Sequence, residues 1–396
     1  MPALCSPPGP GALPALGAVR RCLDDVPPGA RILVACSGGA DSLALLLAVG
    51  ELVRPGGARE DLRGAARALH VDHGLRPESG AEGDFVAGVC EQLGLPLLRV
   101  GVDARVGRDG RRRPGGPEAG ARAARREAYA RHLEAGDFLL LGHTADDQAE
   151  QVLLALARGA GLRAVAGISP RAELAGAVIL RPLLGLRRAQ TEAACAAFGT
   201  HYVRDPSNRA DGPWRAADGS ALRRAAVRER ALPALAAALG TDPIPALART
   251  AAQARADLEA LDLLAARLYR EALLPGGGPA LASQAGGGAA ATSATNAHRE
   301  GGRGGEAAGG ASANQGGEIR LDCAILAGAP RALRTRALHL AGQEAGWEPS
   351  AINASHIDAL DALVTSYRGQ KETHLPANVR AHRSGPALRI WRKNGP

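Results

Sequence analysis

The chain contains few cysteines, almost no lysine and no long apolar run. Its six cysteines are scattered, and no C-x-x-C pair occurs, which argues against a zinc ribbon, an iron–sulfur centre and a disulfide scaffold. No apolar run approaches membrane-spanning length, and no basic segment precedes an apolar core at the N-terminus. We therefore expect a soluble, cytoplasmic protein without a membrane partner.

Lysine occurs only at positions 371 and 393, so arginine supplies the other 46 of the 48 basic residues. The formal net charge of +8 favours a polyanionic partner such as nucleic acid. A composition rich in arginine, alanine and glycine is also typical of proteins from a GC-rich genome. The charge balance alone therefore does not identify the partner.

A length of 396 residues is enough for two or three domains. Short apolar segments typical of buried strands alternate with helical patterns. The strands are predicted at 32–36, 68–71, 97–100 and 138–141, and the helices between them at 79–94 and 117–135. This alternation predicts an α/β fold with a doubly wound, Rossmann-like parallel sheet, which we assign to residues 1–215.

Three segments of different composition follow this domain. Residues 216–274 are rich in Ala, Leu and Arg at helical spacing, which predicts a helical subdomain broken at its prolines, Pro233 among them. Residues 275–317 are almost all small or polar, which predicts a disordered linker. Large apolar residues return over 318–396, where 11 Lys and Arg against 7 Asp and Glu leave a net charge of +4. A small α+β C-terminal domain is expected there.

The segment 32–47 has the pattern of a strand, a glycine turn and a helix. Gly38 and Gly39 allow a close backbone approach that a Cβ would prevent, so several N–H groups can converge on an anion at the helix N-terminus. Ser42 is expected to cap this helix. No lysine precedes Ser42 and no G-x-G-x-x-G occurs here, which excludes the common nucleoside triphosphatase loop and a dinucleotide site.

The glycine turn instead resembles the S-G-G-x-D-S loop of the PP-loop ATP pyrophosphatases, which adenylate a substrate and release pyrophosphate. The matching residues, predicted to bind ATP, are Ser37, Gly38, Gly39, Ala40, Asp41 and Ser42. An aspartate beside phosphates is best explained by a divalent cation between them, so Asp41 is also the predicted ligand of Mg²⁺.

Further motifs resemble the tRNA(Ile)-lysidine synthetases within that superfamily. The H-V-D-H-G-L-R element begins at His70, and the later motifs follow in the order of that family. These motifs cover residues 70–79, 118–125, 143–150, 158–162, 181–183 and 205–208. The resemblance extends from about residue 28 to 240, and more weakly over 330–392.

This resemblance implies a two-step reaction. ATP adenylates the C2 carbonyl oxygen of the wobble cytidine in the isoleucine tRNA with a CAU anticodon, and the ε-amine of L-lysine then displaces AMP to give lysidine. Adenylation is chemically reasonable because a ring carbonyl oxygen is a poor leaving group, whereas AMP departs readily. The C-terminal domain is expected to clamp the tRNA, with formation of a homodimer as its alternative role.

Asp147 and Glu150 lie three positions apart on a helix expected to begin at a capping residue, Asp146, so they share a face and can receive an ammonium group or its proton. The predicted catalytic residues are Asp41, Asp147 and Glu150. Further cofactor contacts are predicted for His70, Asp72 and His143. Substrate contacts are predicted for Arg122, Arg125, Asp205, Asn208, Arg224 and Arg228.

Three positions depart from the family pattern: Gln151 replaces a usual Thr, Arg126 a usual Tyr, and Ala225 the Asn of an R-N-x-x-R motif. Two other functions remain as alternatives. A tRNA cytidine thiolase of the same superfamily is disfavoured by the missing C-x-x-C pairs. A non-catalytic RNA-binding protein explains the arginine content but gives the intact glycine loop no use.

Overall fold

The computed structural model describes residue 4 and residues 7–74, 79–107, 111, 113, 116–205, 209–212, 214–215, 219–275, 318–347 and 351–393. Contacts divide the chain into two compact units, Met1–Ala256 and Asp257–Pro396. Apart from its first residue, the predicted linker over 275–317 lies outside the described residues. The four-part division of the chain stays a prediction.

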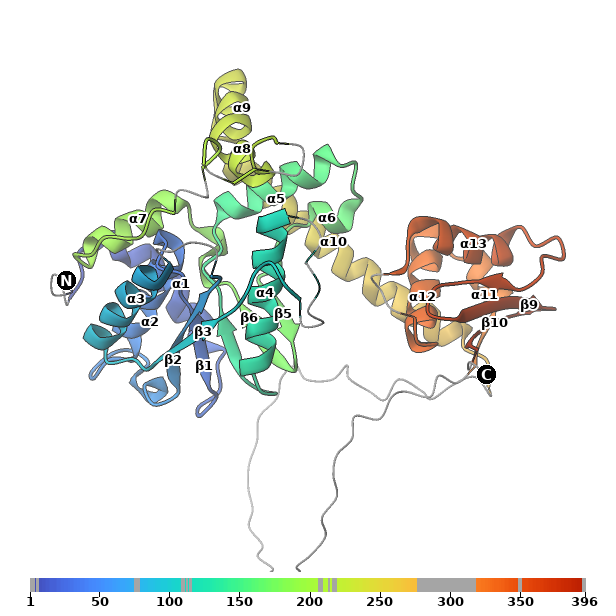
Figure 1. The fold of residues 1–396 in the computed structure, drawn as a ribbon. Helices are drawn as coiled ribbons and strands as arrows, with labels where there is room; N and C mark the ends of the chain where they lie inside the picture. Colours follow the sequence, from blue (N-terminus) through green and yellow to red (C-terminus); the bar gives the residue numbers. More distant parts are fainter. Residues whose placement is uncertain are drawn as a thin grey trace, which may run out of the picture. The chain divides into compact units, whose positions relative to one another are not determined.

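The first unit is built on a six-stranded sheet (Figure 1). Its strands are β1 (Ile32–Ala35), β2 (Ala66–Asp72), β3 (Leu97–Gly101), β4 (Phe138–Leu140), β5 (Arg171–Leu174) and β6 (Ala177–Leu180). The order is β3-β2-β1-β4-β6-β5, and all neighbours are parallel except β5 and β6. The predicted doubly wound parallel sheet is confirmed, with one antiparallel edge strand added.

Helices cover both faces of this sheet because alternate strand residues point to opposite sides. Ile32 and Val34 share a core with α1 (Leu13–Asp24), α2 (Ala40–Val53), α3 (Ser79–Leu93) and α7 (Arg188–Ala197). Leu33 and Ala35 face a second core with α4 (Gly116–His132). Helix α2 is apolar on nearly every side because the sheet, α1, α3 and α7 all pack against it.

Short helical turns complete this layer. They are the 3₁₀ turns η1 (Pro10–Ala12), η2 (Glu60–Leu62) and η3 (Pro182–Gly185). Of these, η1 and η3 lie beside α7 and α1 respectively.

The helices after residue 222 pack against α5 (Ala145–Ala157), which follows β4. They are α8 (Arg223–Ala226), the π-helical turn η5 (Val227–Ala231), α9 (Leu232–Leu239) and α10 (Pro243–Ala272), and a short α6 (Leu162–Val165) adjoins α5. The expected break at Pro233 is wrong, because the helical run continues from Arg223 to Leu239 and the π-helical turn η5 lies directly before this proline, where the backbone adjusts to its missing N–H.

Among the described residues, no single helix has the length and apolar content needed to cross a membrane. The helices over 223–239 and 243–272 meet that test only when joined, and they are bent by 101° at their break.

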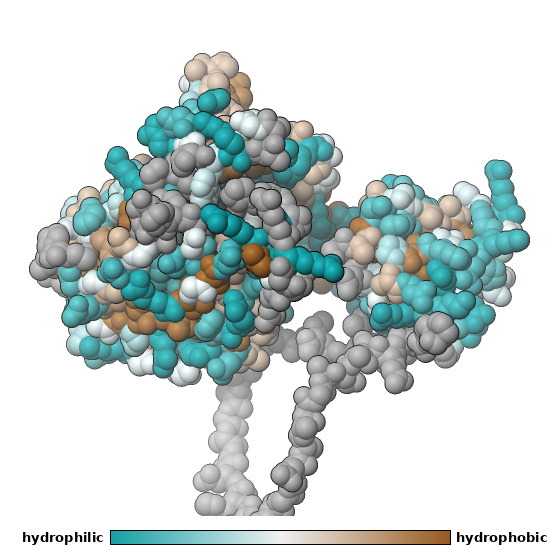
Figure 2. Space-filling view, viewed as in Figure 1, coloured by the Kyte–Doolittle hydropathy of each residue, from teal (hydrophilic) through white to brown (hydrophobic). Residues whose placement is uncertain are grey.

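The second unit carries an antiparallel sheet of order β7-β10-β9-β8. Its strands are β7 (Ile319–Asp322), β8 (Thr373–His374), β9 (Val379–Ser384) and β10 (Ala387–Arg392), and its helices are α11 (Cys323–Gly328), α12 (Arg331–Glu344) and α13 (Ala354–Thr365). One face holds the apolar core with these helices and the end of α10. Much of the visible surface of this unit is hydrophilic (Figure 2). The predicted small α+β domain is confirmed as a fold.

Leu46→Ala should lower the free energy of unfolding by about 3 kcal/mol, because this fully buried side chain on α2 leaves a cavity between the sheet and its helical layer. Leu13→Ala, at a position 64% exposed, is the matched control and should change little. Urea titrations followed by circular dichroism measure both, and equal losses for the two variants would contradict the assigned core.

Candidate active site

The glycine loop lies where the strand order reverses, between β1 and β4. These two strands pair directly, with Ile32 opposite Phe138, so the segments that follow them meet at one edge of the sheet. The contact is close at Gly142, where an added Cβ would lie 2.8 Å from the carbonyl oxygen of Asp41 and 2.9 Å from Cα of Ser42. Such a reversal point is the usual ligand site of an open α/β sheet.

The loop is closed by its own serines. Gly38 has φ +86°, a left-handed conformation that favours glycine. The Ser42 hydroxyl accepts a hydrogen bond from the Ser37 backbone N–H and donates one to the Gly39 carbonyl, each 3.1 Å long. The expected capping by Ser42 is wrong, because the helix begins at Ala40 with Gly39 as its N-cap. Ser42 instead ties the two ends of the loop together.

Strand β2 supports the loop from the side. His70 is buried, at 3% exposed, and one ring nitrogen lies 2.9 Å from the carbonyl oxygen of Cys36, just before the loop. Asp72 accepts a hydrogen bond from the Gly74 N–H at 2.9 Å. Neither contact tests the predicted role in cofactor binding.

Helix α5 begins at Ala145 with Thr144 as its N-cap, so the expected capping by Asp146 is also wrong. The Asp147 carboxylate accepts hydrogen bonds from the backbone N–H and hydroxyl of Thr144, at 2.8 and 3.1 Å. Asp146 turns to α7, where it accepts from the Arg188 backbone N–H at 2.9 Å and from Arg187 Nε at 3.1 Å. One oxygen of Asp147 is therefore used to begin the helix.

Arg188 joins the three predicted catalytic carboxylates. Its nitrogens lie 3.0 Å from Asp41, 3.3 Å from Asp147 and 3.9 Å from Glu150. Thr191, one turn later on α7, donates a hydrogen bond of 2.5 Å to Asp41. Neither Arg188 nor Thr191 is among the residues predicted from the sequence. The available signal was a pair of arginines at a helix N-terminus, where the helix dipole disfavours cations.

Glu150 is the most deeply buried of the three carboxylates. Its side chain is fully buried, and Oε1 accepts a 2.6 Å hydrogen bond from Arg228 Nε. Its Oε2 is buried without a hydrogen-bond partner in the described part of the chain. Burial raises the pKa of Glu150, against the opposing effect of Arg228.

The other two carboxylates differ in their electrostatics. Burial raises the pKa of Asp41, although Arg188 and Thr191 oppose it. For Asp147, burial also acts to raise the pKa, but Arg188, His143 and the Thr144 N–H together bring it below its ordinary value. Asp147 is thus the more strongly held anion, and Glu150 is the better proton acceptor.

Arginines surround His143 at the ends of β4 and β6. Burial, together with repulsion from Arg181, Arg122 and Arg224, lowers the pKa of His143 to about 4. Arg181 shows the same crowding, since burial and repulsion from Arg122, Arg126 and Arg255 lower its pKa to about 10. This concentration of positive charge suits a phosphate group.

The other residues predicted to bind substrate do not form one cluster, and each is described by its own contact. Arg125 lies 3.3 Å from a ring nitrogen of His73, and burial, followed by the charge of Arg125, lowers the pKa of that histidine to about 4. Asp205 acts on the same histidine in the opposite sense. Arg224 donates to Gln151 at 3.2 Å. Asn208 lies outside the described residues.

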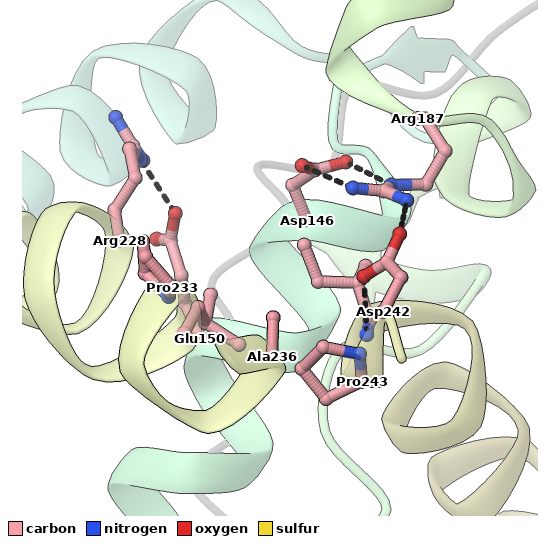
Figure 3. Close-up of a pocket in the computed structure, with 10 residues that line it drawn as sticks. Asp146, Glu150, Arg187, Arg228, Pro233, Ala236, Asp242 and Pro243 are labelled. Carbon is pink, nitrogen blue, oxygen red and sulfur yellow. Dashed lines mark hydrogen bonds and ion pairs between the residues drawn. The ribbon is translucent and has the colours of Figure 1, made fainter. Parts of the chain in front are cut away.

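A pocket of about 200 Å³ opens beside Glu150 (Figure 3). One wall is apolar, from Leu232, Pro233, Ala236 and Ile244. The rest is charged: Glu150 faces Arg228, and Arg187 bridges Asp146 and Asp242. An apolar wall between groups of both signs fits a small zwitterion with an aliphatic stem.

Comparisons with known proteins agree along the chain. A family model described as a PP-loop domain matches residues 18–235, and one described as the TilS substrate binding domain matches residues 321–385. Two relatives named tRNA(Ile)-lysidine synthase align with this chain over nearly its full length. That of Salinispora arenicola is 40% identical over 94% of each chain, and that of Thermobifida fusca is 38% identical over 96% of this chain and 97% of its own.

Among solved structures, the U34-tRNA thiolase NcsA from Methanococcus maripaludis covers 63% of this chain and 78% of its own, at 17% identity. The TM-score of 0.46 is too low to support a shared function.

Gly142→Ala should weaken ATP binding at least about tenfold, because the new methyl group meets backbone atoms of Asp41 and Ser42 and displaces the first turn of α2. Gly101→Ala is the control, since no atom lies within 4 Å of a Cβ added at this strand end. Calorimetric titration with ATP compares them. Unchanged affinity in Gly142→Ala would show that this contact does not shape the nucleotide site.

Proposed function

The chain belongs to the tRNA(Ile)-lysidine synthase family, and we propose how its own residues carry out that reaction. The enzyme joins L-lysine to C2 of the wobble cytidine in the CAU-anticodon isoleucine tRNA, using ATP and passing through an adenylated tRNA. The observation that carries our assignment of roles is the meeting of the glycine loop and the α5 carboxylates at Arg188.

The loop Ser37–Ser42 holds the ATP phosphates at the N-terminus of α2, where backbone N–H groups and the helix dipole favour an anion. Two serine hydroxyls and Gly38 keep the loop in the required shape. Adenylation breaks the bond between the α- and β-phosphates as the cytidine O2 attacks, so the loop must stabilise the charge that collects on pyrophosphate.

Asp41 is the residue that would hold Mg²⁺. Mg²⁺ usually takes one or two carboxylates together with substrate phosphates, so a single carboxylate beside the glycine loop suits this ion. Each oxygen of Asp41 has one donor, Arg188 or Thr191, and each retains a further lone pair. When bound, Mg²⁺ neutralises phosphate charge during adenylation.

The tRNA phosphates approach the arginines around His143. Arg122 and Arg126 are exposed on α4, while Arg181 and Arg224 lie deeper. Arg126 stands where the family usually has Tyr, so it adds a cation to this path. The C-terminal unit also binds the tRNA, which is supported by the family model that matches residues 321–385. A homodimer through this unit stays a prediction.

L-Lysine occupies the pocket beside Glu150, with its stem on the apolar wall. Its ammonium group meets Oε2 of Glu150, and Arg187 or Arg228 is available for its carboxylate. The amine attacks C2 only when neutral, and Glu150 takes its proton, helped by a raised pKa. The C–N bond forms as the C–O bond to AMP breaks. Asp147 is less suited, because Thr144 already occupies one of its oxygens.

The reaction is tested by two products of one incubation of the full chain with tRNA and ATP. Pyrophosphate release should require the tRNA, and lysidine in the digested tRNA should appear only when L-lysine is added. Pyrophosphate release without tRNA, or a modified cytidine that lacks lysine, would contradict the function.

Glu150→Gln should reduce lysidine formation at least about a hundredfold while adenylated tRNA accumulates, because the proton acceptor for the amine is lost. Glu91→Gln, at an exposed position on α3, is the control and should behave like the parent. Chromatography of nuclease-digested tRNA separates the two species. Equal loss of both species would place Glu150 in the first step instead.

Asp41→Asn should abolish adenylation yet leave tRNA affinity within about twofold, because its proposed contact is with the metal and not with RNA. Asp84→Asn, whose carboxylate pairs with Arg99 on the surface, is the control. Pyrophosphate release and filter binding of labelled tRNA measure the two effects. Adenylation at the parent rate would show that the metal is held elsewhere.

A further inference from the structure

Arg188 lies between Asp41, on the helix that follows the glycine loop, and the carboxylates of α5. Its guanidinium group contacts Asp41 on one side and approaches Asp147 and Glu150 on the other, and its side chain is 22% exposed. Because the guanidinium group of Arg188 lies within 4 Å of all three carboxylates, a second cation bound at Asp147 or Glu150 would lie close to it and be repelled.

The position of Arg188 does not benefit its own helix. It is the first residue of α7, where a positive charge opposes the helix dipole. Its neighbour Arg187 has different partners, Asp146 and Asp242. The two adjacent arginines therefore bind different carboxylates, and of this pair only Arg188 contacts Asp41, Asp147 and Glu150.

Glu150 has capacity for one more donor. Its Oε1 accepts from Arg228 at 2.6 Å and lies 3.9 Å from Arg188 Nη1. Its Oε2 is buried and has no hydrogen-bond partner among the residues that the structure describes. A compact ammonium group with three N–H donors suits this oxygen. An ammonium bound there is repelled by the guanidinium of Arg188, and little solvent screens the pair.

We propose that Arg188 is an internal competitor of the substrate's ε-ammonium group, which must move Arg188 away from Asp147 and Glu150 before lysine binds productively. This inference rests on the proposed lysine site. The contact with Asp41 gives the displaced guanidinium a place to remain. A simple cation has only its charge with which to displace Arg188, whereas lysine also gains contacts from its stem on the apolar wall and from its carboxylate. Arg188 therefore acts as a specificity-determining residue that disfavours simple cations.

The test is calorimetric titration of the full chain with L-lysine. Arg188→Gln should bind lysine about tenfold more tightly, because the competing charge is gone. L-Norleucine has the same backbone charges without the ε-ammonium group, and its affinity should not rise. A merely structural role for Arg188 would weaken binding of both ligands, so the direction of the change separates the two.

Two further variants serve as controls. Arg99→Gln, which removes a surface guanidinium paired with Asp84, should leave lysine affinity unchanged, and Arg188→Lys, which keeps a cation, should stay close to the parent. If Arg188→Gln does not fold, the double variant Asp41→Asn with Arg188→Gln removes one charge of each sign and is titrated in its place.

Unchanged or weaker lysine binding by the folded variant, or an equal gain for norleucine, would overturn the proposal. Lysidine formation by the unaltered chain reports on the function separately. If the product forms but the variant binds lysine no more tightly, only the role of Arg188 is wrong.

Discussion

The parallel pairing of β1 with β4 is the constraint on which the site depends. It places Ile32 opposite Phe138, so two segments far apart in the chain end at the same edge of the sheet. Helices α2 and α5 both begin there, one after the glycine loop and one after Gly142. Asp41 in the first turn of α2 and the carboxylates of α5 can therefore share the single guanidinium of Arg188.

Local pattern was sufficient to predict the strands, the parallel sheet and the phosphate loop, because these depend on apolar periodicity and on glycine. The errors concern helix ends. Ser42 and Asp146 were expected to cap helices, whereas Gly39 and Thr144 do so. Residues of several types can begin a helix, and the neighbouring chain decides which side chain is free for that task. Pro233 does not break its helix either, since the π-helical turn before it allows the helical run to continue.

The residues that the sequence did not reveal are those whose partners are distant. Arg188 and Thr191 contact Asp41 across 147 and 150 positions of sequence. Gly142 matters only because the backbone of Asp41 and Ser42 lies against it. The periodicity of the sequence does not predict these contacts, because they form only when distant strands pair in the sheet. Motifs in the sequence predict the three carboxylates as catalytic residues, whereas the arginine that pairs with them is found only in the tertiary structure.

Asp147 belongs at once to the architecture of α5 and to the charged cluster, and the two roles share one carboxylate. One oxygen holds the N–H and hydroxyl of Thr144, and the other faces Arg188. Any event that changes the charge around Arg188 is therefore transmitted to the first turn of α5, which can tighten or fray in response. The start of α5 and the electrostatics of the cluster therefore cannot be altered independently at this residue.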